Sequence, residues 1–342
     1  MIKSKFRKLS QVAMDLHKVL ATISLMGVIF IGQTGIAAAQ DAYPRKSIRI
    51  VVPFAPGGTA DILARIVAQE ASKAPLDAKT SWQFYVENIT GGGGLVGAQT
   101  VARAAPDGYT FLLCHIGCAI GHHLSGYQGW DPATAIIPVI LVGNSPNILV
   151  TGPSITASTL SDFLALARSK PGKLSMASSG PGSSSHLSGE LLRAKASIEL
   201  LDVPYRGSSG AMPDLLSGRV DSMIMGLPES LPFVREGKLK ALGVTSDSRV
   251  ASLPNVPTIA EAGVRGYSFP GWLSIFAPAG TPADIVMALN ILLDKTIKSP
   301  PVLRAFSEQS IQPGGGPPKI AGDLFRADVE LWPQLLKARN PR

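Results

Sequence analysis

The chain has 342 residues, of which 45% are apolar, 16% are charged and 6% are aromatic. This composition supplies a sizeable core and disfavours extensive disorder, and the length suits about two domains. The net charge is +8, but lysines and arginines are not gathered into the basic stretch expected of a nucleic-acid-binding face.

The N-terminus has the parts of a secretory signal peptide. A basic segment is followed by the apolar run VLATISLMGVIFIG, and the small residues Ala37 and Ala39 precede Gln40. Residues 1–39 are therefore predicted to be a cleaved signal peptide that sends the protein to the periplasm. An uncleaved membrane anchor is the less favoured alternative, because the apolar run is short for a span. The leader carries five basic residues and one acidic residue, so the mature chain keeps a net charge of +4.

The first part of the mature chain alternates strands, tight turns and helices. Strands are predicted over residues 47–53, 83–87 and 109–113, and helices over residues 60–68 and 95–103. The turns are rich in glycine, as in PFAPGG and TGGGG. This order is typical of a parallel α/β sheet.

The run VILVGNSPNILV after Pro138 is long enough to leave one lobe and enter another. The same order then repeats: TLSD resembles a helix cap, and the turns SSGPGSSS and RGSSG each lead from a strand into a helix. Near Pro270, GWLSIFAPAG predicts a return to the first lobe, followed by helices over 282–297 and from 321 to about 336.

We therefore predict an α/β fold with two lobes, a ligand cleft between them and two crossing strands. Lobe 1 is expected to comprise residues 43–143 and 266–342, and lobe 2 residues 144–265. Ligands of open α/β sheets bind beyond the carboxyl ends of the strands. The glycine- and serine-rich turns would face one another there.

The stretch PFAPGGTAD indicates what the cleft holds. A glycine turn before a helix exposes backbone N–H groups to an anion, and each helix N-terminus adds partial positive charge. The Gly-x4-Gly-Lys-Ser/Thr pattern of a nucleotide phosphate loop is absent from the sequence. A carboxylate held by backbone amides and hydroxyls fits better, although the turn alone could be purely structural.

Five segments resemble the substrate-binding proteins of tripartite tricarboxylate transporters, also called Bug-type receptors. They are YPRKSIRIVVPFAPGGTADILAR, GGGGLVGAQTVARAAPDGYTFLL, GSSSHLSGELL, VPYRGSSGAMPDLLSGRVDSM and LPNVPTIAEAGVRGYSFPGWLSIFAPAGTP. The resemblance implies a periplasmic binding protein of the two-lobed, type II-like class. Such a receptor has no cofactor and no catalytic residues, and it closes on a di- or tricarboxylate or an aromatic acid. It passes the ligand to the membrane permease, and we expect it to act as a monomer without nucleic acid.

Matching these motifs residue by residue gives most of the candidate ligand-binding set, and four residues beside the expected cleft complete it. The turns supply Pro56, Gly57, Gly58, Thr59, Asp61, Ser179, Gly180, Ser183, Ser184, His186, Tyr205 and Gly207; the added residues are Phe54, His115, Gly226 and Trp272. Asp61 is expected chiefly to bond backbone N–H groups of its own turn. Tyr205 and Trp272 would cover the ligand or serve as packing. The chain departs from the family pattern at Cys114-His115 and at Gly226, so the resemblance does not fix the ligand.

The segment CHIGCAIGHHL allows several interpretations. Cys114 and Cys118 could form a disulfide in an oxidising compartment, but two packed thiols are favoured because the ring would be small. With His122 they could ligate zinc on a helix, which is the least favoured interpretation. His115 directly follows a strand and is expected to line the cleft.

A secreted serine hydrolase is the alternative function. Ser183 and His186 lie close in sequence, but no Gly-x-Ser-x-Gly elbow surrounds a serine. Their hydroxyl and imidazole groups are expected to cap a helix and to contact the ligand.

Overall fold

The computed structural model describes residues 43–75, 81–125, 131–269 and 271–339, with side chains except at 121–125 and 335–339. The predicted signal peptide lies outside these residues. Lys46–Arg342 form one compact unit, which contains both predicted lobes. In the described part of the chain no helix is both long and apolar enough to cross a membrane.

The first sheet has six strands in the order β11-β4-β10-β3-β1-β2. Strand β1, next to the edge strand β2, pairs in parallel with β2 and β3, whereas β10 runs antiparallel to β3 and β4. β1 reads IRIVV and buries four of its five residues, as a strand covered on both faces should. The strands are β1 (Ile48–Val52), β2 (Phe84–Asn88), β3 (Thr110–Cys114), β4 (Ile136–Asn144), β10 (Trp272–Pro278) and β11 (Gln312–Pro313).

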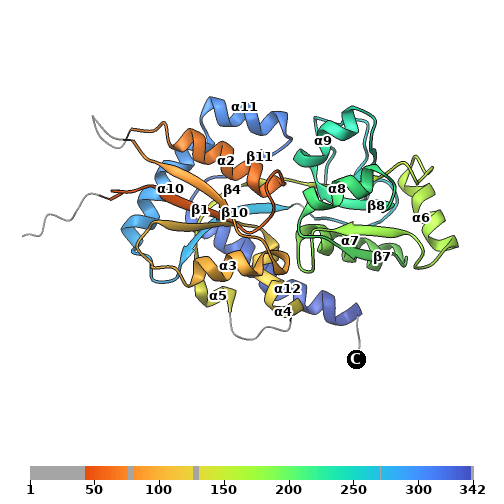
Figure 1. The fold of residues 1–342 in the computed structure, drawn as a ribbon, viewed down its shortest axis with the longest axis horizontal. Coiled ribbons are helices and arrows are strands. Elements are labelled where there is room, and N and C mark those ends of the chain that lie inside the picture. The colour runs from red at the N-terminus through yellow and green to blue at the C-terminus, as the bar shows by residue number, and fades with distance from the viewer. Residues whose placement is uncertain (1–42, 76–80, 126–130, 270, 340–342) are drawn as a thin grey trace, which may run out of the picture. The chain divides into compact units, whose positions relative to one another are not determined.

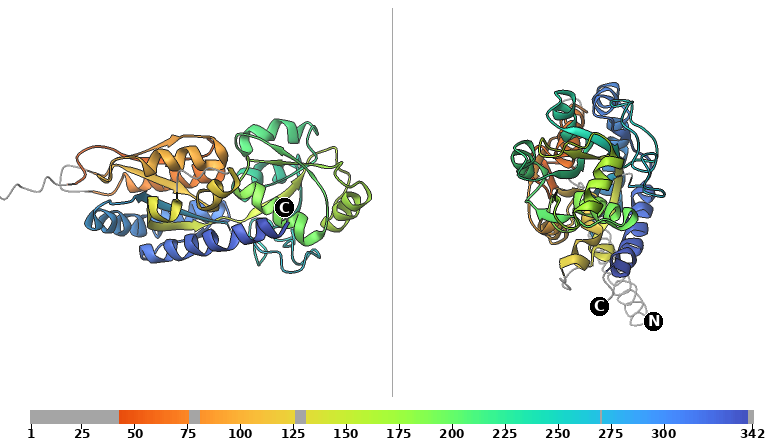
Figure 2. Two further views of the ribbon diagram at one scale, coloured as in Figure 1. Left: turned by 90° about the horizontal axis from the view of Figure 1, so that it is seen from below. Right: turned by 90° about the vertical axis from the view of Figure 1, so that its right-hand side faces the viewer.

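Helices cover both sides of this sheet (Figure 1). They are α2 (Thr59–Ala71), α3 (Leu95–Ala102), α4 (Ile116–Ser125), α5 (Pro132–Ala135), α10 (Ala283–Ile297), α11 (Pro300–Glu308) and α12 (Pro318–Arg339), with the short 3-10 helix η1 (Gly92–Gly94). The long helix α12 packs against β4 and α4, as Figure 2 shows.

The second sheet has five strands in the order β7-β6-β8-β5-β9. β6 is parallel to β7 and β8, and β5 is antiparallel to β8 and β9. Its elements are β5 (Asn147–Thr151), β6 (Ser175–Ser178), β7 (Leu201–Pro204), β8 (Ser222–Gly226), β9 (Lys240–Val244), α6 (Leu160–Ser169), α7 (Ser184–Ala196), α8 (Ser208–Leu216) and α9 (Leu227–Arg235). Thr159 caps α6 by accepting a hydrogen bond from the Asp162 N–H, as the TLSD pattern predicts.

The chain passes twice between the two sheets. The outgoing segment follows β4, and the returning segment precedes β10. The two segments are hydrogen-bonded, because the Ser145 N–H donates to the Gly271 carbonyl at 2.8 Å. The predicted α/β class, with one sheet in each of two lobes and two crossings, is confirmed.

Candidate functional site

A cavity of about 390 Å³ lies where strands of both sheets end. The residues after β1, β3, β6, β7 and β8 all contribute to its wall, and α2, α7, α8 and α9 all begin there. Strand-to-helix turns from both lobes thus surround one space, as the turn pattern predicts. Each of these helices directs unpaired N–H groups and partial positive charge toward it.

The first glycine turn is held in shape by Asp61. The Asp61 carboxylate accepts hydrogen bonds from the Gly57 N–H at 3.0 Å, from Arg65 at 2.9 Å and from Asn88 at 3.0 Å. Burial alone would raise the pKa of Asp61, but these hydrogen bonds together lower it below its usual value. The Gly57 N–H group and the Asp61 carboxylate are therefore already hydrogen-bonded to each other. Gly58 and Thr59, in contrast, line the cavity.

The second turn, between β6 and α7, presents hydroxyl groups. The Ser183 side chain caps α7 by accepting a hydrogen bond from the His186 N–H at 3.2 Å. The ring of His186 accepts a bond at Nδ1 from the Gly182 N–H at 3.3 Å. Ser183 and Ser184 line the cavity, and His186 does not. The Ser183 oxygen is thus used as a helix cap, which argues against its being the nucleophile of a hydrolase.

The third turn and the end of β8 bring a carboxyl group into the wall. Gly207 and Ser208 line the cavity at the start of α8, and Gly226 does so at the end of β8. Glu229, three residues further on, accepts a hydrogen bond from the Gly226 N–H at 2.8 Å. Burial raises the pKa of Glu229 to about 7, against the opposing effect of hydrogen bonds from Gly226 and Ser208.

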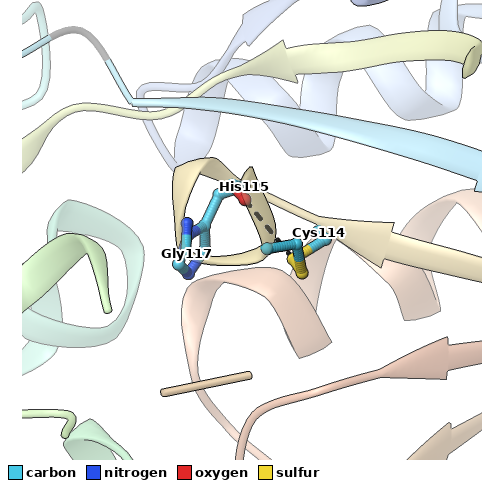
Figure 3. Close-up of a disulfide and its surroundings, with 4 residues drawn as sticks. Cys114, His115 and Gly117 are labelled. Atoms are coloured by element: carbon cyan, nitrogen blue, oxygen red, sulfur yellow. Dashed lines mark hydrogen bonds between the residues drawn. A yellow bond between two sulfur atoms is a disulfide. The ribbon is translucent and has the colours of Figure 1, made fainter. Parts of the chain in front are cut away.

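His115 lies in the wall directly after β3 (Figure 3). Its Nδ1 accepts a hydrogen bond from the Gly117 N–H at 3.0 Å, so a neutral ring carries its proton on Nε2. The ring stacks on Phe54 with centroids 4.3 Å apart. Burial lowers the pKa of His115 to about 3, so the imidazole is neutral at physiological pH.

Beside His115 the structure pairs Cys114 with Cys118 in a disulfide, so the expectation of two packed thiols is wrong. Cys114 ends β3 and Cys118 lies in the first turn of α4, and this sharp reversal brings their Cα atoms to 6.3 Å. That separation is within the ordinary range for a disulfide. Bonded to each other, the two sulfurs are not zinc ligands, and the His122 side chain lies outside the described residues.

Another part of the wall is aromatic, with Lys195 and Asp328 beside the rings. Trp272 is 5% exposed and lines the cavity beside Phe269 and Trp332. The Trp272 indole N–H donates to Asp328 at 2.6 Å. The Trp272 ring therefore forms part of the cavity wall, and its N–H group is already hydrogen-bonded within the protein.

Ten of the predicted residues line this cavity: Phe54, Gly58, Thr59, His115, Ser179, Ser183, Ser184, Gly207, Gly226 and Trp272. Gly180 and Tyr205 line a smaller neighbouring cavity of about 230 Å³, where the Tyr205 hydroxyl donates to Asp214 at 2.7 Å. Pro56, Gly57, Asp61 and His186 line neither cavity.

Sequence reasoning missed several polar residues of the wall, namely Ser145, Asn147, Ser208 and Glu229. The first two interrupt the apolar run VILVGNSPNILV at the crossing, which was a signal that could have identified them. The segment LPESLP gives no comparable signal for Glu229. Glu229 reaches the cavity because α9 begins beside the opposite lobe, which the sequence pattern does not show.

Two hydroxyl groups in the wall have no hydrogen-bond partner among the described residues. Thr59 Oγ1 and Ser145 Oγ are buried and form no hydrogen bond with any described residue. Buried polar groups are seldom left in this state, so these hydroxyls are suited to a ligand. Together with the helix N-termini they give the cavity wall a chemistry that suits an anion. The fold and the site define a two-lobed solute-binding receptor.

Comparison with known proteins agrees with this class. Residues 63–340 match the family model described as the tripartite tricarboxylate transporter family receptor. The protein BugT of Bordetella pertussis is 32% identical over 95% of this chain and 98% of its own. A protein from the tcbD-tcbE intergenic region of Pseudomonas sp. (strain P51) is 39% identical over 91% and 92%. The chain belongs to the tripartite tricarboxylate transporter receptor family.

Solved structures support the same assignment. Rpa4515 from R. palustris with adipate is 35% identical, with a TM-score of 0.80 over 86% of this chain and 98% of the other. MatC from Rhodopseudomonas palustris with bound malate is 30% identical, with a TM-score of 0.80 over 86% and 99%. The periplasmic binding protein BugD is 31% identical at the same TM-score, over 86% and 98%. The chain therefore matches solute-binding receptors rather than enzymes, and the hydrolase alternative has no support.

Proposed function

We propose that the mature protein, cleaved after Ala39, works as a monomer in the periplasm and binds a small organic carboxylate in the cavity between the strand-to-helix turns. It then delivers this ligand to the permease subunits of its transporter. The receptors solved with adipate and malate support a carboxylate as the ligand class. The observation that carries the proposal is that four helices begin at one cavity that also holds the unpartnered hydroxyls of Thr59 and Ser145.

In this arrangement the carboxylate is held without an arginine. Helix N-termini offer backbone N–H groups and partial positive charge, and these suffice to bind an anion where water is excluded. The hydroxyls of Thr59, at the start of α2, and of Ser145, in the crossing after β4, would donate to the ligand. Phe54, His115 and Trp272 would pack against its body.

A thermal-shift screen of organic carboxylates, sugars and amines tests the proposal. A carboxylate at about a hundredfold its dissociation constant should stabilise the protein by roughly 2.7 kcal/mol, and sugars and amines should have no effect. Ser145→Ala should weaken the carboxylate, because it removes a hydroxyl donor from the wall. Ser169→Ala, at the exposed end of α6, is the matched control and should leave binding unchanged.

If sugars or amines raise the melting temperature and no carboxylate does, the carboxylate assignment is rejected. Mass measurement of the secreted protein would separately show whether cleavage occurs after Ala39. Size-exclusion chromatography with light scattering would show whether the protein is a monomer.

A further inference from the structure

Glu229 places a carboxyl group inside the cavity that is proposed to receive a carboxylate. One of its oxygens accepts a hydrogen bond from the Gly226 N–H at 2.8 Å, and Ser208 at the start of α8 donates another. The other oxygen faces the first glycine turn, since a Cβ atom added to Gly58 would lie 3.4 Å from Glu229 Oε2. The carboxyl group therefore lies between helix N-termini of both lobes.

The lysine of the cavity is far from this group. Among the described residues of the wall, Lys195 is the only lysine or arginine. It is in the last turn of α7, eleven residues after Ser184. At 1.5 Å per residue it lies about 16 Å along the helix from the glycine turns. Lys195 therefore does not balance the charge of Glu229, and helix N-termini must do so.

The charge supplied by the helices can be counted. α2, α7, α8 and α9 begin at the cavity, as does α4 at Ile116, and each contributes about half a positive charge at its N-terminus. Together they can balance about two carboxylates. Glu229 is already one of them. The remaining positive charge matches one ligand carboxylate, and a second ligand carboxylate at this end would meet Glu229 without a counter-charge.

We propose that Glu229 makes this receptor selective for ligands with a single carboxylate at the glycine-turn end, because its own carboxyl takes the place of a second one. This inference rests on the proposed function. A ligand with two adjacent carboxylates would force two like charges together, which is costly unless one of them takes up a proton. Of the ligand classes raised by the sequence, this disfavours those that carry two neighbouring carboxylates at this end. The aromatic rings of Phe269, Trp272 and Trp332 suit the body of the ligand.

Isothermal titration with benzoate and phthalate tests the inference, because phthalate is benzoate with a second carboxylate on the neighbouring carbon. At about pH 8 the wild type should bind benzoate more tightly by about tenfold or more, the factor equivalent to one pKa unit of interaction. Glu229→Gln should remove this preference, since an amide of the same shape carries no charge. Glu236→Gln, at the exposed far end of α9, is the matched control and should keep it.

The wild type offers a second measurement that does not depend on a variant folding. Lowering the pH from about 8 to about 6 should reduce the ratio of the benzoate affinity to the phthalate affinity. The reason is that Glu229 takes up a proton and loses its negative charge. Burial also raises the pKa of Asp328 elsewhere in the wall, so an effect of pH that persists in Glu229→Gln would come from Asp328. Groups near α9 should not produce this effect, and Asp214 on α8 is bonded to Tyr205 and Arg219. Asp61 and Arg65 on the adjacent α2 form an ion pair with each other, and His115 stays neutral because burial lowers its pKa to about 3. The adjacent strands β5 and β8 carry no ionisable side chain, and Lys240 on β9 donates to backbone carbonyls.

Two results would overturn the inference while leaving the proposed function intact. The first is that the wild type binds phthalate as tightly as benzoate, and the second is that Glu229→Gln keeps the wild-type preference. Failure of all carboxylates in the thermal-shift screen would instead reject the proposed function itself.

Discussion

His115 shows how burial sets the charge of a residue in the wall. It is 9% exposed, stacks on Phe54 and accepts a hydrogen bond from the Gly117 N–H. This leaves its Nε2–H group as a donor that can reach a ligand oxygen. A protonated ring would place a charge in an apolar wall and would lose the bond from Gly117. The neutral form is therefore the one that the surroundings stabilise.

This leads to a prediction on stability and pH. The pKa of His115 is about 3 in the folded protein and about 6.5 in the unfolded chain, so between these values only the unfolded state binds the proton. Its contribution to stability is thus complete above pH 6.5 and is lost as the pH falls toward 3. Relative to His115→Gln, the wild type should lose free energy of unfolding, at most about 4 kcal/mol, between about pH 7 and pH 4.

Denaturant unfolding of both proteins at several pH values checks this, because the difference between them removes the contributions of all other titrating groups. A difference that stays constant with pH would show that the His115 imidazole keeps an ordinary pKa in the folded protein.

Among the elements, the turn between β1 and α2 depends on a single carboxylate. Asp61 joins Gly57, Arg65 and Asn88, and Asn88 also donates to the Phe54 carbonyl at 2.9 Å. The turn before the first helix is thereby tied to β2. Asp61 thus fixes the backbone of the turn that places Gly58 and Thr59 in the cavity wall, and in the proposed function it would serve the ligand only indirectly.

Removing this carboxylate should cost both stability and binding. Asp61→Ala removes a buried carboxylate that accepts hydrogen bonds from three groups, and we expect a loss of about 1–3 kcal/mol in the free energy of unfolding. Asp162→Ala, at the start of α6 and exposed, should cost below about 1 kcal/mol. Urea denaturation measures both. Equal losses for the two variants would contradict the special role of Asp61.

How far the sequence predicts these elements depends on what fixes them. Apolar strands such as IRIVV and glycine turns are local features, and the predicted strands and turns agree with the structure. The sequence did not indicate α4 and α11, because α4 begins directly after a strand and α11 begins with two prolines. The Cys114–Cys118 pair depends on that strand-to-helix reversal, which residue spacing alone does not reveal.

The residues of the site also fall into two groups, those that the sequence indicates locally and those that only the three-dimensional arrangement brings to the cavity. Gly58, Thr59 and Ser183 belong to turns that the sequence marks, and they line the cavity. Glu229 and Ser145 reach it because of how the lobes and crossings lie in space, and no sequence pattern encodes that arrangement. The ligand-binding role of all these residues remains a prediction.

At the scale of the whole unit, glycines allow the two lobes to approach closely around the cavity. A Cβ atom on Gly93 would lie 1.8 Å from the Pro181 carbonyl oxygen, and one on Gly226 would lie 1.8 Å from Thr59 Oγ1. Gly207 has a similar contact with Ala55, at 2.8 Å. These contacts join opposite lobes, so the lobes touch beside the cavity in the described conformation.

Gly226 offers a way to test closure, because its φ of −61° is open to any residue. Gly226→Ala therefore adds a methyl group without straining the backbone, but the methyl group collides with Thr59 when the lobes close. We expect the ligand found in the screen to bind at least about tenfold more weakly, since closing would cost about 1.4 kcal/mol or more. Gly210→Ala, whose Cβ meets nothing closer than 4.0 Å, is the matched control.

Small-angle X-ray scattering gives the structural readout of this prediction. In the wild type and in Gly210→Ala, saturating ligand should reduce the radius of gyration, because the lobes rotate about the crossing where Ser145 bonds to Gly271. In Gly226→Ala the radius should contract only at ligand concentrations at least about tenfold higher, in step with the weakened binding. A Gly226→Ala protein that still contracts and binds with wild-type affinity would show that the contact with Thr59 does not limit closure. The lobes would then have to meet through a different set of residues.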